Sequence, residues 1–129
     1  MEELHIKVNE DYIREAAYLE TKGAAEQTEI LLGMDDPPTC ILYPDDYAAI
    51  GGINEIRERG LRIPEDISIV GFDDTWISTL TYPSITTIHQ PVQEMCEYAI
   101  EAIVKKVKSE KVPSQVVFPV ELIDRESTK

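Results

Sequence analysis

The sequence predicts an α/β fold in which a parallel sheet is flanked by helices. Predicted strands at 4–8, 39–43 and 67–72 alternate with helix-forming segments at 19–33 and 47–59. Alternation at this spacing is typical of βαβ units, whose crossovers are right-handed. The length of 129 residues fits one domain.

The segment before the second strand contains the first predicted helix. Residues 9–18 are either a loop or a short helical piece, and 19–33 form the helix. Gly23 is expected to permit close packing of this helix on a sheet. The helix ends before Pro37, because proline cannot continue a helix.

A nearly all-apolar strand and a helix with clear end signals follow. The run "TCILY" (39–43) predicts a strand covered on both faces, as in a buried parallel sheet. Asp45 or Asp46 can act as the N-cap of the helix at 47–59, and Gly60 suits its C′ position. The expected buried stripe of this helix is Ile50, Ile53 and Ile56.

The second half contains another buried strand and a long amphipathic helix. "ISIVGF" (67–72) and "SITTI" (84–88) predict strands, and 92–108 predicts a helix. Residues 114–124 predict one or two strands, broken at Pro119. The predicted apolar face of the long helix contains Val92, Cys96, Ala99, Ile103 and Val107.

The composition excludes several classes of protein. With 12 basic and 25 acidic residues, the net charge of −13 repels phosphate backbones, so we exclude direct nucleic-acid binding by this chain. No apolar run approaches the roughly 20 residues of a membrane span, and the acidic N-terminus has no signal-peptide core. These features predict a cytoplasmic location with no membrane partner. Cys40 and Cys96 are expected to be buried free thiols, and no metal site or cofactor is predicted.

Acidic pairs follow two of the predicted strands. Asp45 and Asp46 come after the strand at 39–43, and Asp73 and Asp74 come after "ISIVGF". Because the carboxyl ends of parallel strands meet at one edge of a sheet, both pairs should lie together there. Carboxylates there can accept strong hydrogen bonds from sugar hydroxyls, bind a cation, or act in acid–base chemistry.

Each carboxylate also has a purely structural interpretation. Asp46 is favoured as the helix N-cap over a ligand contact, and Asp74 can fix a turn through its own backbone. Asp45 and Asp73 leave both interpretations open.

The remaining polar and aromatic side chains form no catalytic motif. A Gly-rich phosphate loop and a nucleophile elbow are both absent from the sequence, and His5 and His89 lie far apart. We therefore predict no catalytic residues, and expect His89 to be a partly exposed strand-end residue. Trp76 is favoured as a core or interface residue over a ligand-stacking one, and Tyr18 leaves both interpretations open.

Three motifs occur in a fixed order along the chain. "PTCILYPDDYAAIGGINEIRERGLRIPEDISIVGFDD" is followed by "PSITTIHQP" and by "ELIDREST" at 121–128. Together they resemble the effector-binding domain of LacI/GalR-type transcription regulators, most densely from Pro38 to Pro91. The resemblance implies a partial periplasmic-binding-protein-like (type I) fold, in which two α/β subdomains close over a small ligand, most often a sugar or related metabolite.

The resemblance also implies five effector-binding residues. Asp73 matches the first Asp of the Gly-(Phe/Tyr)-Asp-Asp motif, whose carboxylate commonly contacts the ligand. Tyr18 matches an aromatic residue that often stacks on the effector, and Gln90 a polar cleft residue near the crossover between subdomains. Asp46 matches the Asp of an Asn-Asp pair, and Asp45 stands in place of its Asn. An acceptor-only carboxylate at that position should change which ligand hydroxyls are accepted, or favour a cationic group.

The same resemblance divides the chain into two parts. Residues 1–91 would form most of the C-terminal subdomain, and 92–129 a crossover helix and C-terminal strands that pack on the other subdomain or return to the first. No helix-turn-helix occurs in the chain, so we expect a truncated fragment that meets DNA only through a domain absent from it. The uncovered face of the helix at 92–108 predicts a homodimer or other self-association, by exchange of this helix.

The sequence thus predicts the effector-sensing part of a DNA-binding transcription regulator, with a carbohydrate as its small-molecule effector. Closure over the ligand would shift the spacing of the DNA-binding heads of the full protein. The alternative is a sugar-binding component of a transport system with the same fold. An enzyme would need a nucleophile or a metal set that the sequence does not offer.

Overall fold

The computed structural model describes residues 9–129, so the strand predicted at 4–8 lies outside the described residues. Helices at 19–33 and 47–59 and strands at 39–43, 67–72 and 84–88 were expected between 9 and 91, and an element of the expected kind overlaps each of these ranges. In chain order the elements are η2 (Glu10–Tyr12), α1 (Thr21–Leu32), β1 (Cys40–Leu42), α2 (Asp46–Glu58), β2 (Ser68–Val70), η3 (Trp76–Thr79), β3 (Thr87–His89), α3 (Val92–Val107) and β4 (Glu121–Ile123).

The strands confirm the predicted parallel α/β arrangement and add an antiparallel end. β1 pairs with β2 in parallel, with Ile41 opposite Ile69. A parallel bridge between Val70 and Thr86 brings the segment of β3 beside β2. β3 then pairs with β4 in the antiparallel sense. Of the predicted tail strand at 114–124, only Glu121–Ile123 is in a strand.

The core lies between the helices α1 and α2 and one face of β1 and β2. Ile41 and Ile69 are buried on this face. On the other face Leu42 is 66% exposed, so the prediction of a strand buried on both sides is wrong for the described residues. Cys40 and Cys96 are free but exposed, which corrects the expectation that both thiols are buried.

Two small residues let α2 pack closely against its neighbours. A Cβ atom at Gly51 would overlap the backbone carbonyl of Thr21 in α1, and one at Gly52 would overlap the ring of Tyr43. Gly23 does not serve the predicted role, because a Cβ atom there would meet the side chain of Glu20 rather than a sheet. The close contact between α1 and α2 therefore depends on Gly51.

The ends of α2 follow the sequence signals, with one correction. Asp45 is the N-cap, and its Oδ1 accepts a hydrogen bond from the backbone N–H of Ala48 at 2.8 Å. The favoured assignment of Asp46 as the cap is wrong, since Asp46 is the first helical residue. Gly60 follows the C-cap residue Arg59 with φ of +75°, as expected for a C′ glycine.

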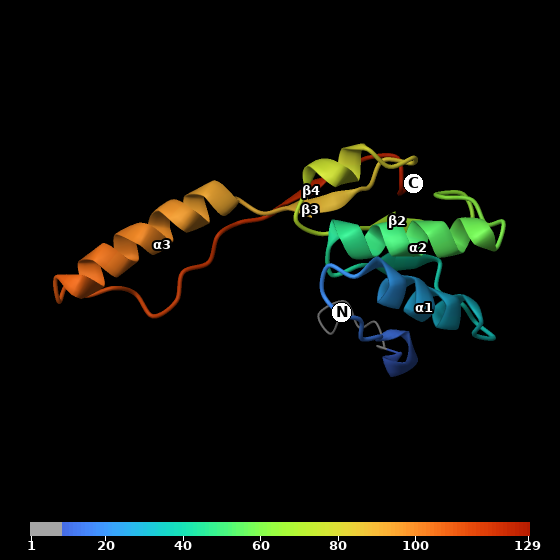
Figure 1. Cartoon of the computed structure of the whole chain (residues 1–129), viewed down its shortest axis with the longest axis horizontal. Coiled ribbons are helices and arrows are strands. Elements are labelled where there is room, and N and C mark those ends of the chain that lie inside the picture. The colour runs from blue at the N-terminus through green and yellow to red at the C-terminus, as the bar shows by residue number, and fades with distance from the viewer. Residues whose placement is uncertain (1–8) are drawn as a thin grey trace.

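The helix α3 extends away from the rest of the molecule (Figure 1). None of its residues is buried. The chain returns from it beside the helix, where the rings of Tyr98 and Phe118 meet edge to face with centroids 5.8 Å apart. None of the helices in residues 9–129 is both long and apolar enough to cross a membrane.

The C-terminal segment returns to the body and closes over β2 and β3. The backbone N–H of Ile69 donates to the carbonyl of Ser127 at 2.8 Å. The Ser127 hydroxyl donates to the carbonyl of Ile69 at 2.6 Å and accepts from the N–H of Thr86 at 2.8 Å. Ser127 is therefore fully buried and bonded on all sides, far from β2 in sequence but adjacent to it in space.

Candidate functional site

Three of the five predicted site residues meet at the carboxyl end of β2. The phenol of Tyr18 donates to Asp73 Oδ2 at 2.8 Å, and the amide of Gln90 donates to Asp73 Oδ1 at 2.5 Å. Tyr18 precedes α1, Asp73 follows β2 and Gln90 follows β3, so three separate segments converge on one carboxylate. Asp73 is partly exposed and Tyr18 is 62% exposed, which leaves both accessible to a ligand.

The backbone at Asp73 has an uncommon conformation. Asp73 and Asp74 have φ of +94° and +50°, in a region that residues other than glycine rarely adopt. Neighbouring groups hold them there: the N–H of Asp73 donates to the carbonyl of Ile88 at 3.0 Å, and Asp73 bridges to His89. Such strain gathers at binding sites, where the surrounding structure fixes a side chain in position.

The hydrogen bond to Asp73 also changes the acidity of Tyr18. Because the phenol donates to a carboxylate, the pKa of Tyr18 is raised above its ordinary value, and desolvation acts in the same direction. Tyr18 therefore stays protonated and remains a hydrogen-bond donor throughout the physiological range.

Asp45 fixes the segment that carries Tyr18. Besides capping α2 with Oδ1, it accepts a hydrogen bond at Oδ2 from the backbone N–H of Leu19 at 3.0 Å. Asp45 is fully buried, so both carboxylate oxygens are used within the chain. A direct effector contact by Asp45 stays a prediction, and it would require the buried carboxylate to become accessible.

Asp46 fixes the loop after β2 in the same way. Its Oδ1 accepts from the hydroxyl of Thr87 at 2.6 Å, and its Oδ2 accepts from the N–H and the hydroxyl of Thr75 at 2.7 and 2.8 Å. Asp46 is fully buried too. Its predicted contact with an effector is likewise untested, and the observed bonds connect α2 to the loop that carries Asp73.

Asp74 joins the site to the C-terminal segment. Its Oδ1 accepts from the guanidinium of Arg125 at 2.6 Å, and its Oδ2 lies 2.9 Å from Nδ1 of His89. Partial burial acts to raise the pKa of Asp74, but the hydrogen bonds from Arg125 and His89 outweigh it and lower the pKa. Asp74 thus holds the turn through these two side chains, not through its own backbone as expected.

The side chains of His89 and Trp76 are both exposed to solvent, which tests the expectations for them. His89 is the last residue of β3 with a side chain 48% exposed, which confirms a partly exposed strand end. Trp76 is 68% exposed, so it is not a core residue, and the interface and stacking interpretations stay predictions.

A cavity of about 580 Å³ adjoins Asp73. Its lining runs from Asp73 and Asp74 through His89 and Gln90 to the first turn of α3. The volume falls in the range of small-molecule sites, roughly 300–1,000 Å³. The lining combines carboxylates, an imidazole and an amide, which suits a ligand rich in hydrogen-bonding groups. In the described residues no group of three or more His, Cys, Asp or Glu is arranged to hold a metal ion.

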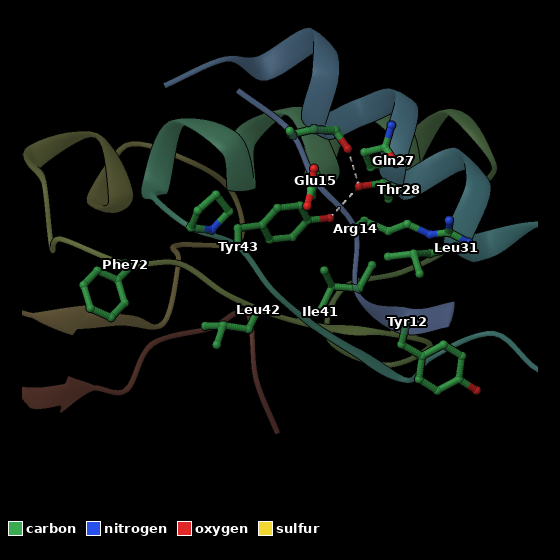
Figure 2. A pocket seen from close by; sticks show the side chains of 13 residues that line it. Tyr12, Arg14, Glu15, Gln27, Thr28, Leu31, Ile41, Leu42, Tyr43 and Phe72 are labelled. Carbon is green, nitrogen blue, oxygen red and sulfur yellow. Dashed lines mark hydrogen bonds between the residues drawn. The ribbon is translucent and has the colours of Figure 1, made fainter. Parts of the chain in front are cut away.

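A larger cavity, of about 720 Å³, lies elsewhere, between the segment before α1, the helix α1 and the strand β1 (Figure 2). It is lined by apolar groups such as Ile41, Leu31 and Phe72, and inside it the hydroxyls of Thr28 and Tyr43 are hydrogen-bonded to each other at 2.7 Å. Burial raises the pKa of Tyr43 to about 12. None of the five predicted site residues lines this cavity, so it does not belong to the site at Asp73.

The sequence reasoning missed the residues that hold the site from a distance. Thr75 and Thr87 bind Asp46, and Arg125 binds Asp74 and also donates to the carbonyl of Ile85 at 2.8 Å. The motif "ELIDREST" contains Arg125 and could have marked it as a candidate. Its partners Ile85 and Asp74, however, lie 40 and 51 positions away in sequence.

Comparison with known proteins identifies the family. The sequence profile of the Periplasmic binding protein-like domain matches residues 1–128. This chain belongs to that family. The relatives described next confirm the predicted resemblance to LacI-type effector-binding domains.

Two curated relatives are transcription regulators by name. The HTH-type transcriptional repressor PurR of Aliivibrio salmonicida is 36% identical over 108 residues, covering 84% of this chain and 32% of the repressor. Catabolite control protein A of Priestia megaterium is 36% identical over 125 residues, covering 96% of this chain and 37% of that protein. The periplasmic binding protein-like chain thus spans about a third of the length of these relatives.

Solved structures show the same relationship. The transcription regulator CcpA of Lactococcus lactis matches 98% of this chain and 46% of its own, with a TM-score of 0.88 and 27% identity. A LacI-type transcriptional regulator from Bacillus cereus subsp. cytotoxis matches 99% of this chain and 45% of its own, with a TM-score of 0.91 and 25% identity. The periplasmic binding protein-like fold predicted from the sequence is therefore confirmed.

Proposed function

We propose that this chain is the effector-sensing part of a LacI-type transcription regulator, and that its effector is a small hydroxyl-bearing molecule, with a carbohydrate as the expected class. One observation supports the proposal above all: the partly exposed carboxylate of Asp73 lies at the carboxyl end of β2, where Tyr18 and Gln90 converge on it. Ligands of parallel sheets bind at this edge, and an ionised carboxylate accepts hydrogen bonds from hydroxyl groups.

In this proposal, Asp45 and Asp46 position the segments that carry the ligand-binding side chains. Asp45 holds the segment of Tyr18, and Asp46 holds the loop after β2. Both are fully buried, so ligand contact is left to Asp73, Tyr18 and Gln90. The aromatic ring of Tyr18, exposed beside the carboxylate, offers an apolar surface for the face of a sugar ring.

Gln90 gives the site a connection to α3. It lies one residue before Pro91, the N-cap of α3, and its amide donates a hydrogen bond to Asp73 Oδ1 at 2.5 Å. A ligand hydroxyl that replaces this amide on Asp73 releases the segment leading into α3. Binding would then bias a two-state element, as a regulator requires, with residues 1–91 as most of one subdomain and 92–129 as the crossover helix and C-terminal strands. DNA would be contacted by another part of such a regulator.

The proposal is tested by thermal and urea unfolding of the chain with D-glucose, D-galactose and D-ribose as probes. A ligand present at 100 times its Kd stabilises the folded state by about 2.7 kcal/mol. We expect Asp73→Ala to abolish the stabilisation, and Tyr18→Phe, which removes only the hydroxyl, to reduce it.

Tyr82→Phe is the matched control, because Tyr82 is 79% exposed and lies outside the cavity at Asp73. A stabilising sugar whose effect survives Asp73→Ala would contradict the proposed site. The absence of stabilisation by any sugar, with the fold intact, would contradict the proposed carbohydrate class.

A further inference from the structure

The cavity of about 580 Å³ at Asp73 has an acidic lining. Its carboxylates are Asp73, Asp74 and Glu94, and among the described residues that line it there is no lysine or arginine. Asp74 is paired with the guanidinium of Arg125 at 2.6 Å. Within residues 9–129, neither Asp73 nor Glu94 forms an ion pair. Two negative charges at the cavity wall therefore have no positive partner in this part of the chain.

Two further carboxylates near Tyr18 add to the negative potential. Asp45 and Asp46 are fully buried, and they accept hydrogen bonds from neutral backbone N–H and hydroxyl groups. The N-terminus of α2 offsets only about half of one charge. The pKa of Tyr18 is raised by its hydrogen bond to Asp73, by desolvation, and by the charges of Asp73, Asp45 and Asp46. The buried carboxylates thus act on the side chain that lies beside Asp73, and buried charges are screened less by salt than exposed ones.

The ring of Tyr18 offers a cation a second favourable contact. The side chain is 62% exposed, and its hydroxyl lies 2.8 Å from Asp73 Oδ2. An ammonium group within about 6 Å of an aromatic ring is attracted by the negative face of the ring. A carboxylate and an exposed aromatic ring side by side are therefore suited to a positively charged group.

Asp73 retains the capacity to accept further hydrogen bonds. Its Oδ1 accepts one bond from Gln90 and its Oδ2 accepts one from Tyr18. A carboxylate has about four acceptor sites, so about two are left for a ligand. An ammonium group has three donor hydrogens and no acceptor, so it can bind these sites while the two bonds within the chain persist.

We propose that the effector at Asp73 is an amino sugar, whose ammonium group donates hydrogen bonds to Asp73 and is attracted by Glu94 and by the buried carboxylates. The hydroxyls of the same sugar ring would bind the neutral polar groups of the cavity. A neutral sugar would leave the acidic lining uncompensated, and a phosphorylated sugar would be repelled by it. The inference rests on the effector role proposed for Asp73 and adds a positive charge to that ligand.

Isothermal titration calorimetry on the complete 129-residue chain tests the charge, with ligands that differ only in the amino group. The pairs are D-glucosamine with D-glucose, D-galactosamine with D-galactose, and D-mannosamine with D-mannose. In at least one pair we expect the amino sugar to bind about tenfold tighter or more, because its hydrogen bond to the carboxylate is charge-assisted. N-acetyl-D-glucosamine, which is uncharged, should show no such advantage over D-glucose.

The dependence on salt separates a charge effect from a better fit of shape. The Debye length falls from about 30 Å at 0.01 M salt to about 3 Å at 1 M. The preference for the amino sugar should therefore shrink over this range, whereas the affinity of its neutral parent should change little. A preference that is independent of salt would overturn the proposed attraction by the acidic lining.

Glu94→Gln tests the lining itself, because it removes one charge and keeps the size of the side chain. Glu94 is exposed in the first turn of α3, so the fold should persist. We expect the preference for the amino sugar to fall by about two- to fivefold. Glu101→Gln is the matched control, since Glu101 is exposed in the same helix but lies outside the cavity lining. An unchanged preference in Glu94→Gln, or an equal loss in both variants, would contradict the role of Glu94.

The failure of this inference is distinguishable from the failure of the effector role. Neutral sugars that bind as tightly as their amino derivatives would overturn the cationic effector and leave a carbohydrate site at Asp73 in place. If neither the neutral nor the amino sugars bind to the folded chain, the carbohydrate effector is contradicted together with its charge.

Discussion

The backbone N–H of Leu19 donates a hydrogen bond to Asp45 Oδ2 at 3.0 Å, and this bond joins the residue after Tyr18 to the cap of α2. Leu19 has φ of +58°, an uncommon value for a residue other than glycine. One buried carboxylate thus closes a helix end and holds the segment that carries Tyr18 in its unusual conformation.

Replacing Asp45 with Ala should destabilise the fold by about 1–2 kcal/mol, because the cap is lost and the N–H of Leu19 loses its acceptor. Asp45→Asn should cost much less, since an asparagine side chain also caps helices well. Urea unfolding followed by circular dichroism measures both. Asn9→Ala, which removes the cap of the exposed η2 turn, is the control and should have little effect. Equal stabilities of Asp45→Ala and wild type would show that the bond to Leu19 is unimportant.

Helix propensity and packing predict opposite effects on stability when Gly51, at the contact between α1 and α2, is replaced by alanine. Alanine is favoured over glycine in a helix by about 1 kcal/mol. Gly51→Ala should nevertheless destabilise the protein by about 1–3 kcal/mol, because the new methyl group overlaps the backbone carbonyl of Thr21. Thermal unfolding measures the change.

Gly33→Ala is the matched control for that substitution. A Cβ atom at Gly33 would lie 3.4 Å from the nearest atom, the carbonyl oxygen of Glu29, and its φ of −86° suits any residue. We expect a nearly neutral effect there. A stabilised Gly51→Ala variant would mean that α1 and α2 are farther apart than described.

Asp74 should make stability depend on pH in the acid range. Its pKa is lowered in the folded state, so its contribution is fully present above the unfolded value of about 3.9. That contribution is lost as the pH falls through the lower folded value. Asp74→Asn should therefore reduce stability at neutral pH and flatten the acid dependence, as measured by urea unfolding between about pH 7 and pH 3.

Asp35→Asn provides the comparison for Asp74, because Asp35 is an exposed acid in the turn after α1. Its replacement should leave the acid dependence close to that of wild type. An unchanged acid profile in Asp74→Asn would show that the ion pair with Arg125 does not contribute to stability.

Ser127→Ala should destabilise the fold by about 1–3 kcal/mol, since the N–H of Thr86 and the carbonyl of Ile69 would lose a buried partner. Ser114→Ala, in the exposed return from α3, should be nearly neutral. Equilibrium unfolding in urea compares the two. If both variants matched wild type, water would have to replace the hydroxyl of Ser127 in the buried position.

The elements of this fold were predictable because their signals are local. The cap at Asp45, the stripe of Ile53 and Ile56 and the C′ glycine at Gly60 all depend on residues within a few positions of one another. The alternation of strands and helices then gave the parallel arrangement, and the motif around Asp73 gave the edge where the candidate site lies.

The features that the sequence did not predict depend on distant partners. No local pattern distinguishes the cap Asp45 from Asp46, because the bonds of Asp46 go to Thr75 and Thr87. Leu42 is as apolar as the buried Ile41, and only the absence of a covering element in the described residues makes it exposed.

The closure by Ser127 has a consequence for synthesis on the ribosome. Residues 125–128 are translated after every segment that they bind, so the body of the domain cannot complete its hydrogen bonding while they remain in the exit tunnel. Until then the carbonyl of Ile69 and the N–H of Thr86 lack the partner that the folded chain gives them. A nascent chain stalled before Arg125 should therefore remain sensitive to protease, and it should become resistant only after the final motif emerges.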